Sequence, residues 1–392
     1  MHIILFDGPQ RDHLLPLTFT RPVGALRWGI LTIAEKWERT LGHMPTYLTV
    51  DYLQEKYPFS PGDVNLYING GLCPDESLLE SIDELEDGQA LISGEDLLVW
   101  KSTAHWDGAE WEQEIEAFDY QEEFTLCRRP WDLFSKNGEQ LEADYNMLTA
   151  ARQSAPISAT NTIIGDRIFL EDDAEVEGAI LNSKGGPIYV GAGATIMEGS
   201  VVRGALALCE HSQLKLSAKI YGPTTIGPHS KVGGEVNNSI IQGYSNKGHD
   251  GFLGNSVIGE WCNLGADTNT SNLKNNYDEV KLWSYEKGGF EKTGLQFCGL
   301  VMGDHSKCGI NTMFNTGTVV GVSANIFGSG FPRNYIPSFS WGGPAGISEY
   351  RFDKAMETAS RVMERRQLEL DEVELSILRH VFDDTSSFRK SK

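Results

Sequence analysis

The sequence predicts three successive parts: an α/β domain over residues 1–155, a left-handed parallel β-helix over residues 156–345, and C-terminal helices with a tail over residues 346–392. Three observations support this prediction. Helical and strand patterns alternate in the first part, an aliphatic residue recurs at every sixth position in the second, and helical periodicity returns after residue 349. A chain of 392 residues also exceeds the usual size of one domain.

The first 155 residues alternate between short apolar runs and amphipathic stretches, which is typical of mixed α/β domains. We expect helices over residues 31–41 and 75–85, where acidic residues near the start of the second helix favour its dipole. The expected strands cover residues 3–6, 46–50, 90–92 and 97–100.

Beyond residue 155, aliphatic positions fall six residues apart in five separate series. They are Ile164, Leu170 and Val176; Val190, Ile196 and Val202; Ile226 and Val232; Ile258 and Leu264; and Met302, Cys308, Phe314, Val320 and Ile326. This period predicts coils of three short strands, with the apolar residue inside and a small residue at the corner. Each coil buries its apolar face only by stacking on its neighbours. The alternative is an irregular β-sandwich with chance spacing, and five in-phase series argue against it.

The six-residue phase is interrupted at residues 205–215 and 283–297. We interpret the second interruption, which is rich in Glu, Lys and Gly, as a polar loop outside the β-helix. Two apolar stripes then predict a helical pair that covers the open end of the β-helix, and residues 383–392 are expected to form a frayed tail. The stripes are Phe352, Met356, Ala359, Val362 and Met363, and Leu370, Val373, Ile377 and Val381.

Composition excludes several classes of function. A formal charge of −22 would repel nucleic acid over most of the surface, although a local Lys/Arg cluster could still hold small phosphorylated substrates. No 18-residue apolar stretch predicts a membrane span, and residues 1–8 lack the basic region of a signal peptide. The six cysteines form no CxxC pair, which favours reduced thiols and a cytoplasmic protein.

Residues 233–274 are the segment in which chemistry is expected, because polar side chains gather there within an aliphatic repeat. His249 lies between glycines, and Asn263 and Asn272 follow 14 and 23 residues later. Since a coil uses about 18 residues, His249 and Asn263 are expected on adjacent coils. Imidazole is partly neutral near pH 7 and suits a general base, while amides suit an oxyanion. A lone histidine is otherwise more often a hydrogen-bonded surface residue.

This segment resembles the acetyltransferase half of the bifunctional GlmU family, which makes UDP-N-acetylglucosamine. The shared pattern is His249, an aromatic residue three positions on, Leu-Gly, Ile-Gly, Asn263, Gly-Ala, a threonine and Asn272. Residues 272–274 and 308–311 resemble archaeal relatives still more closely. The resemblance implies acetyl-CoA as cosubstrate and a homotrimer in which acetyl-CoA lies between neighbouring β-helices.

The resemblance also implies roles for individual residues. His249 would take a proton from the glucosamine amine, Asn263 and Asn272 would hold the amino sugar, and Ala266 would lie against the thioester. Phe252 stands where the family has a tyrosine, Asn237 where it has a lysine, and Lys219 where it has an arginine. Lys247 and Lys281 could replace the missing charge beside the sugar phosphate. Asp304, aligned with a serine near the thioester, and Val322 would complete the acetyl-CoA site.

The N-terminal part resembles sugar nucleotidyltransferases through Gly8, Arg11 and Pro16, which follow the first strand as in the phosphate-binding loop of that family. Leu17 stands where the family has a lysine, and Arg21 and Arg27 could supply that charge. The stretch from Arg128 to Asp132 resembles the family's Pro-Trp-Asp pattern. The resemblance implies binding of a nucleotide by Gly8, Arg11, Arg21 and Asp132, with Mg²⁺ whose ligands are not assigned. A simple strand-to-loop turn and a tryptophan at the domain joint are the alternatives.

The sequence therefore favours a bifunctional enzyme that N-acetylates an amino-sugar 1-phosphate and then transfers a nucleotide from UTP, with small molecules as its partners. One alternative keeps the acetyltransferase and makes the N-terminal domain a degenerate regulatory or sugar-phosphate-binding module. Another is activity like that of a glucose-1-phosphate thymidylyltransferase. A non-catalytic assembly protein is disfavoured by the polar residues that gather around His249. A zinc hydratase is disfavoured because His211, His229, His249 and His305 share no ligand spacing.

Overall fold

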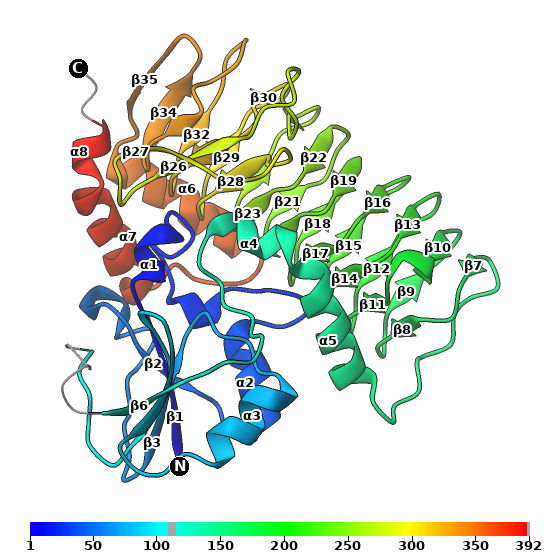
Figure 1. The fold of residues 1–392 in the computed structure, drawn as a ribbon. Coiled ribbons are helices and arrows are strands. Elements are labelled where there is room, and N and C mark those ends of the chain that lie inside the picture. The colour runs from blue at the N-terminus through cyan, green and yellow to red at the C-terminus, as the bar shows by residue number, and fades with distance from the viewer. Residues whose placement is uncertain (109–114, 390–392) are drawn as a thin grey trace. The chain divides into compact units, whose positions relative to one another are not determined.

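The computed structural model describes residues 1–108 and 115–389 and contains two compact units (Figure 1). The first unit comprises Met1–Leu14, Thr20–Leu26 and Leu31–Arg129. The second comprises Leu15–Phe19, Arg27–Ile30 and Pro130–Lys392. The domain boundaries expected at residues 155 and 345 stay predictions.

The first unit is an α/β fold around a six-stranded sheet of order β2-β1-β3-β5-β4-β6. The central strand β1 pairs in parallel with β2 and β3, whereas β5 runs antiparallel to β3 and β4. The expected strands are present, although the second ends two residues early. The strands are β1 (His2–Phe6), β2 (Thr46–Leu48), β3 (Asn65–Asn69), β4 (Gln89–Ser93), β5 (Asp96–Ser102) and β6 (Glu116–Asp119).

The two expected helices of this unit form where their capping residues allow. Helix α2 (Ile33–Leu41) begins with a capping box between Thr32 and Glu35 and ends at Gly42, whose left-handed backbone (φ 76°) suits glycine. Helix α3 (Glu76–Asp83) begins at Asp75, whose carboxylate accepts the Leu78 N–H. Two short helices, α1 (Gln10–His13) and the 3₁₀ turn Val23–Ala25, follow β1.

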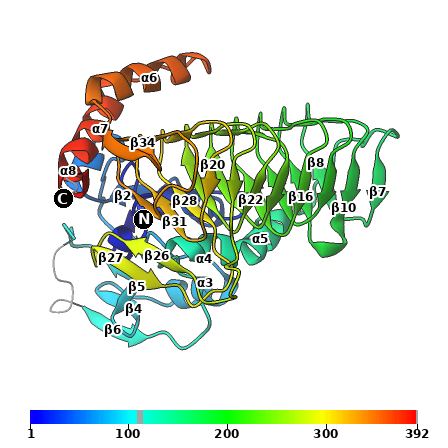
Figure 2. The same ribbon diagram turned by 90° about the horizontal axis from the view of Figure 1, so that it is seen from above.

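The second unit is a left-handed parallel β-helix, whose coils lie side by side in Figure 2. Its first face holds β7 (Thr162–Ile164), β10 (Ile180–Asn182), β13 (Val201–Arg203), β16 (Lys219–Tyr221), β19 (Glu235–Asn237) and β22 (Phe252–Gly254). Its second face holds β8 (Ile168–Leu170), β11 (Ile188–Val190), β14 (Leu206–Leu208), β17 (Thr224–Ile226), β20 (Ile240–Gly243), β23 (Val257–Glu260), β28 (Leu300–Met302), β31 (Thr318–Val320) and β33 (Tyr335–Ile336). Its third face holds β9 (Glu175–Val176), β12 (Thr195–Ile196), β15 (Gln213–Leu214), β18 (Lys231–Val232), β21 (Asn246–Lys247), β24 (Asn263–Leu264), β29 (Lys307–Cys308), β32 (Asn325–Ile326), β34 (Ser340–Gly343) and β35 (Gly346–Glu349).

All of the predicted aliphatic positions except Ile164 belong to one continuous core inside the coils. Ile164 pairs with Asn182, one place away from the inward column that contains Leu181, so its prediction was wrong. Register pairs Ile196 with Leu214 and Leu214 with Val232, so these side chains stack along the axis. The interruption predicted at residues 205–215 was wrong. Leu208 and Leu214 continue the six-residue phase, and β14 and β15 pair with the coils on both sides.

The excursion predicted at residues 283–297 is present, but it is more ordered than the expected loop. It contains an antiparallel hairpin of β26 (Lys281–Ser284) and β27 (Gly289–Lys292). Trp283 stacks on Tyr335 of β33 with 4.1 Å between ring centroids, which fastens the hairpin to the coils. A short pair of strands, β25 (Asn269–Thr270) and β30 (Met313–Phe314), lies in the same part of the β-helix.

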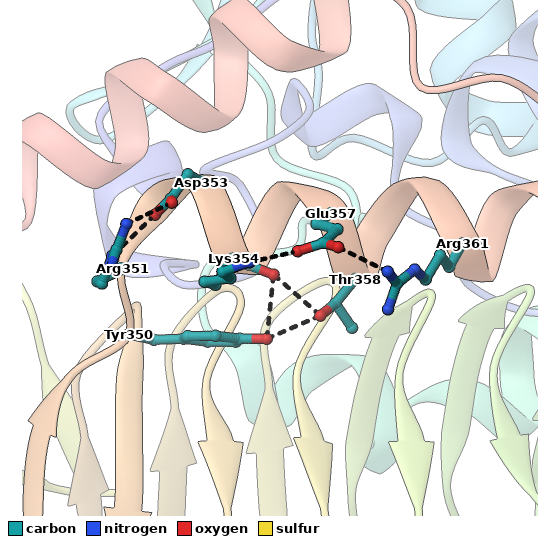
Figure 3. Close-up of polar contacts among 7 residues, drawn as sticks. All are labelled: Tyr350, Arg351, Asp353, Lys354, Glu357, Thr358 and Arg361. Carbon is teal, nitrogen blue, oxygen red and sulfur yellow. Dashed lines mark hydrogen bonds and ion pairs between the residues drawn. The ribbon is translucent and has the colours of Figure 1, made fainter.

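The expected C-terminal helices are α6 (Phe352–Glu364) and α7 (Glu372–Asp384). Phe352 of α6 and Phe382 of α7 both pack on Phe339 near the last coil. Helix α6 also crosses above several strands of the β-helix, and Glu357 bridges Lys354 and Arg361 along its surface (Figure 3). The helix therefore runs along the coils in addition to packing near their end.

The frayed tail expected from residue 383 was wrong for residues 383–389, and residues 390–392 lie outside the described part. Helix α7 continues to Asp384, and α8 covers Ser386–Arg389. The Arg389 guanidinium donates to the Phe382 carbonyl at 2.7 Å and lies over the Phe382 ring, which holds this end in place.

Segment Arg27–Ile30 is bound to the second unit, although it lies between parts of the first unit in sequence. The Ile30 N–H donates to Asp144 of α5 (Asn137–Thr149), and the Thr225 hydroxyl donates to the Gly29 carbonyl. The other helix of this region is α4 (Pro130–Ser135). No helix within residues 1–108 and 115–389 has the length and apolar character needed to cross a membrane.

Candidate active site

A groove of about 590 Å³ runs along the third face of the β-helix, beside the C-terminal end of α6. His249, Asn263 and Ala266 all line it, so the structure brings three of the predicted site residues together. Its other lining residues are Lys215, Lys231, Tyr244, Asn246, Gly248, Trp261, Cys262, Leu264, Gly265, Lys307, Ile310, Val362, Arg365 and Arg366.

His249 lies on a corner between two faces. The four residues 248–251 connect β21 on the third face with β22 on the first face. In the preceding coil, the corresponding corner is only Gly233 and Gly234. A Cβ atom on Gly234 would lie 2.8 Å from the His249 carbonyl oxygen, so a side chain there would collide with the His249 corner. The glycine corner thus lets the two corners lie against each other, and the His249 side chain is exposed.

The remaining residues predicted to hold the amino sugar do not line the groove. Phe252 and Lys219 share an outward column of the first face, with Glu235 in register between them. Asn272 donates its amide to Asn255 at 2.8 Å. Lys281 begins the hairpin β26, away from the residues that line the groove. His249 therefore stands between the groove on one side and the Phe252–Lys219 column on the other.

Three predicted contacts are not supported by the placement of the side chains. Lys247 is 2% exposed and points into the coil, where its ammonium donates to the Gly233 and His249 carbonyls, so it cannot meet a sugar phosphate outside. Asp304 is 4% exposed, and its carboxylate accepts the Glu260 N–H. Val322 is fully buried. Neither of the last two side chains lines the groove to contact acetyl-CoA.

Five cationic side chains line the groove, and no carboxylate appears among the described residues that line it. They are Lys215, Lys231, Lys307, Arg365 and Arg366. Burial lowers the pKa of Lys231, and the nearby charges of Arg366, Lys215 and Arg365 lower it further. In a chain with a formal charge of −22, this concentration of mutually repelling cations forms a local site for an anion.

Sequence reasoning missed an aromatic column, of which Tyr244 and Trp261 line the groove. His211, His229, Tyr244, Trp261 and His305 occupy equivalent corner positions with φ between 51° and 61°. Their rings stack along the axis, with 4.3 Å between the centroids of Tyr244 and Trp261. Left-handed corners favour Gly and, among the other residues, Asn, Asp and His, so Tyr244 and Trp261 gave no signal. Only the coil period, which places His211 and His229 18 residues apart, could have found it.

A second polar cluster lies in the first unit, at the carboxyl ends of the parallel strands. The Asp7 carboxylate accepts the Val23 N–H at 2.8 Å and the Thr49 hydroxyl at 2.5 Å. Burial raises the pKa of Asp7 to about 6, against the lowering effects of Thr49, Val23 and Arg11. This edge of a parallel sheet is where α/β folds bind ligands. Asp7 and Thr49 were not among the predicted residues.

The predicted nucleotide-binding residues are divided between the units. Gly8 and Arg11 adjoin this cluster, and the Arg11 guanidinium donates to the Tyr52 hydroxyl at 2.7 Å and lies 3.7 Å from the Asp7 carboxylate. Arg21 is 5% exposed. Asp132 belongs to α4 of the second unit. Within residues 1–108 and 115–389, no group of three or more His, Cys, Asp or Glu side chains is placed to hold a metal ion.

Comparison with known proteins finds a sugar nucleotidyl transferase family and proteins named as bifunctional. Residues 3–153 match the sequence model of a family described as sugar nucleotidyl transferase. A bifunctional protein GlmU from Methanocaldococcus jannaschii is 37% identical over 87 residues, which cover 22% of this chain and 21% of that protein. A bifunctional sugar-1-phosphate nucleotidylyltransferase/acetyltransferase from Sulfurisphaera tokodaii is 26% identical over 215 residues, which cover 54% of this chain and 47% of that protein. The chain thus matches less than half the length of either relative.

The groove lysine Lys307 predicts a pH dependence of stability. Its ammonium donates to the Trp261 and His305 carbonyls, and burial lowers its pKa to about 8 from 10.5. Between pH 8 and 10.5 the unfolded chain therefore keeps a proton that the folded chain has released. The contribution of Lys307 to the free energy of unfolding consequently increases as the pH rises through this range. Relative to Lys307→Met, the free energy of unfolding of wild type should increase by on the order of 1–3 kcal/mol across this pH range.

Chemical denaturation of both proteins at several pH values measures this difference. Buried thiols such as Cys298, whose pKa burial raises to about 12, act in the opposite direction but are common to both proteins. Lys184→Met, which removes an exposed ammonium, is the control and should track wild type. A constant difference between wild type and Lys307→Met from pH 7 to 11 would contradict the prediction.

Proposed function

We propose that this chain, which is similar to bifunctional GlmU proteins and whose residues 3–153 match the sugar nucleotidyl transferase family, catalyses two transfers. The β-helix transfers an acetyl group from acetyl-CoA to the amine of an amino-sugar 1-phosphate, with glucosamine 1-phosphate as the acceptor. The N-terminal unit transfers a nucleotidyl group from UTP, with Mg²⁺, to give UDP-N-acetylglucosamine.

The observation that carries the proposal is the placement of His249 beside a cationic groove. Coenzyme A ends in phosphate groups, and charge-assisted hydrogen bonds from Arg365, Arg366 and Lys231 suit them. The pantetheine arm would follow the groove towards Ala266, which lies one corner beyond His249 along the axis. This arrangement supports a polyanionic thioester donor.

The proposed step needs one base and one donor. The acceptor amine attacks the thioester carbonyl carbon and loses a proton to the His249 imidazole. The Asn263 amide can donate to the oxygen that becomes negative. The carbon–sulfur bond then breaks, and the departing thiolate takes up a proton. The acceptor would lie on the first-face side of the corner, near Phe252, Lys219 and Asn272.

The acetyl-transfer proposal predicts the effect of removing the base. His249→Ala should lower kcat for acetyl transfer by about 10²–10⁴-fold, the usual contribution of a general base. Thiol release from acetyl-CoA with glucosamine 1-phosphate measures the rate. His43→Ala, which removes an exposed histidine of the first unit, is the control and should match wild type. Arg366→Ala should instead raise the KM for acetyl-CoA about tenfold, with less effect on kcat. A near wild-type rate for His249→Ala would exclude it as the base.

One observation on Arg11 favours an alternative to nucleotidyl transfer by the first unit. The Arg11 guanidinium is engaged by Tyr52, Asp7 and Asp12, which favours the alternative of a degenerate, regulatory or sugar-phosphate-binding unit. The match of residues 3–153 to the sugar nucleotidyl transferase family favours activity.

Pyrophosphate release decides between these two. Wild type with UTP and N-acetylglucosamine 1-phosphate should release pyrophosphate only when Mg²⁺ is present. Arg11→Ala should lower this rate by about tenfold or more through lost charge-assisted bonds, while acetyl transfer stays unchanged. The same assay with dTTP and glucose 1-phosphate tests the thymidylyltransferase-like alternative. Wild type that releases no pyrophosphate with either nucleotide has a degenerate first unit.

We also propose that the active form is a homotrimer. Large apolar side chains are exposed on the β-helix, among them Ile180 and Val201, which are neighbours in register on the first face. Such contiguous apolar surface is a mark of association. Light scattering of the active protein should give three times the 43.4-kDa mass of the chain. Full activity in a fraction with the mass of a single chain would contradict the proposal.

A further inference from the structure

An ammonium group occupies an interior position of the β-helix directly behind the candidate base. Val232 of β18 pairs with Lys247 of β21, so Lys247 takes the inward place that apolar side chains hold in other coils. It is 2% exposed. Its Nζ donates to the Gly233 carbonyl and to the His249 carbonyl, both at 2.9 Å. Burying a lysine is costly unless its charge is well solvated by such acceptors.

The shortened corner explains why Gly233 needs this donor. In four-residue corners, the first carbonyl accepts the backbone N–H three residues later, as Lys215 does from Ala218 and Gly265 from Thr268. The corner of Gly233 and Gly234 is too short for that bond, because β19 begins at Glu235. Lys247 supplies the missing donor from the next coil and uses a second N–H to hold His249.

We propose that Lys247 is a positioning residue whose ammonium clamps the His249 corner to the Gly233–Gly234 corner and so fixes the imidazole for proton transfer. The inference rests on the proposed acetyl transfer. Lys247 touches neither donor nor acceptor, and it acts through the backbone of His249. The clamp requires the charged form, because hydrogen bonds from an ionised donor are about twice as strong as those from a neutral one.

The surroundings of Lys247 give the clamp a pH range. The pKa of Lys247 is lowered to about 8, mainly by burial and to a smaller extent by Lys219. Asp250, Asp267 and Glu235 act in the opposite direction. The ammonium is therefore present at neutral pH and is lost as pH rises through about 8. Acetyl transfer should therefore decline as the pH rises through about 8 and the Lys247 ammonium is lost.

The test compares two substitutions at Lys247 with a control in the same interior column. Lys247→Met fits the apolar column, should fold, and should lower kcat for acetyl transfer about 10- to 100-fold while the KM for acetyl-CoA stays within about twofold. Its rate should show no decline between pH 7.5 and about 9, unlike that of wild type. Lys247→Arg keeps the charge and should shift the decline to higher pH. Leu214→Met, two coils earlier, should match wild type in rate and pH profile.

A measurement without turnover separates this inference from the proposed function. The His249 imidazole resonances, assigned by comparison with His249→Ala, should show a second inflection near pH 8 in wild type and none in Lys247→Met. If wild type transfers no acetyl group, the proposed function fails, and this titration still tests the clamp. Folded Lys247→Met with the wild-type rate and pH profile would overturn the inference, as would wild-type resonances without the second inflection.

Discussion

The coil-to-coil register of the interior side chains is the constraint on which the candidate site depends. Each short strand gains most of its stability by stacking an apolar residue on its equivalents in the neighbouring coils. That stacking fixes which of two successive residues in a strand points into the core and which points outwards. Asn246, Asn263 and Lys307 face the groove because Leu264 and Cys308 must face the core. The groove is therefore a by-product of the same alternation that builds the core.

One departure from the regular coil produces the local chemistry. Consecutive inward positions on the third face are 18 residues apart from Ile196 to Leu214 and to Val232, but only 15 from Val232 to Lys247. The missing residues come partly from the corner of Gly233 and Gly234, which lies directly against the backbone of the His249 corner. The shortening also removes a backbone donor inside the coil, which the Lys247 ammonium replaces. The shortened corner therefore accounts for both the local geometry at His249 and the buried Lys247 ammonium.

The same departure marks the limit of what could be predicted from sequence. The six-residue spacing predicted the β-helix because the core imposes it at many positions. It also predicted His249 and Asn263 on adjacent coils, whereas Ala266 was expected only from the family resemblance. The spacing could not assign inside and outside in the shortened coil, where the phase changes, so it did not indicate that Lys247 points inward. The side chain of Asp304 shows a second limit. An aligned position gives a residue's place in the chain but not the direction of its side chain, and this carboxylate turns to the Glu260 N–H.

The two sides that meet at His249 differ in charge, and this difference orients the proposed reaction. The groove presents five cations. On the first face, Lys219 stands in register with Glu235, whose carboxylate accepts the Tyr221 hydroxyl at 2.6 Å, and beyond them lies Phe252. A polyanionic donor is therefore attracted to the groove, whereas the first face next to Phe252 offers Lys219, whose charge is offset by Glu235. Because Coulomb attraction scales with the ligand's charge, a donor with several phosphates gains far more from the groove than an acceptor with one. Donor and acceptor are thereby sorted to opposite sides of the same imidazole before any specific contact forms.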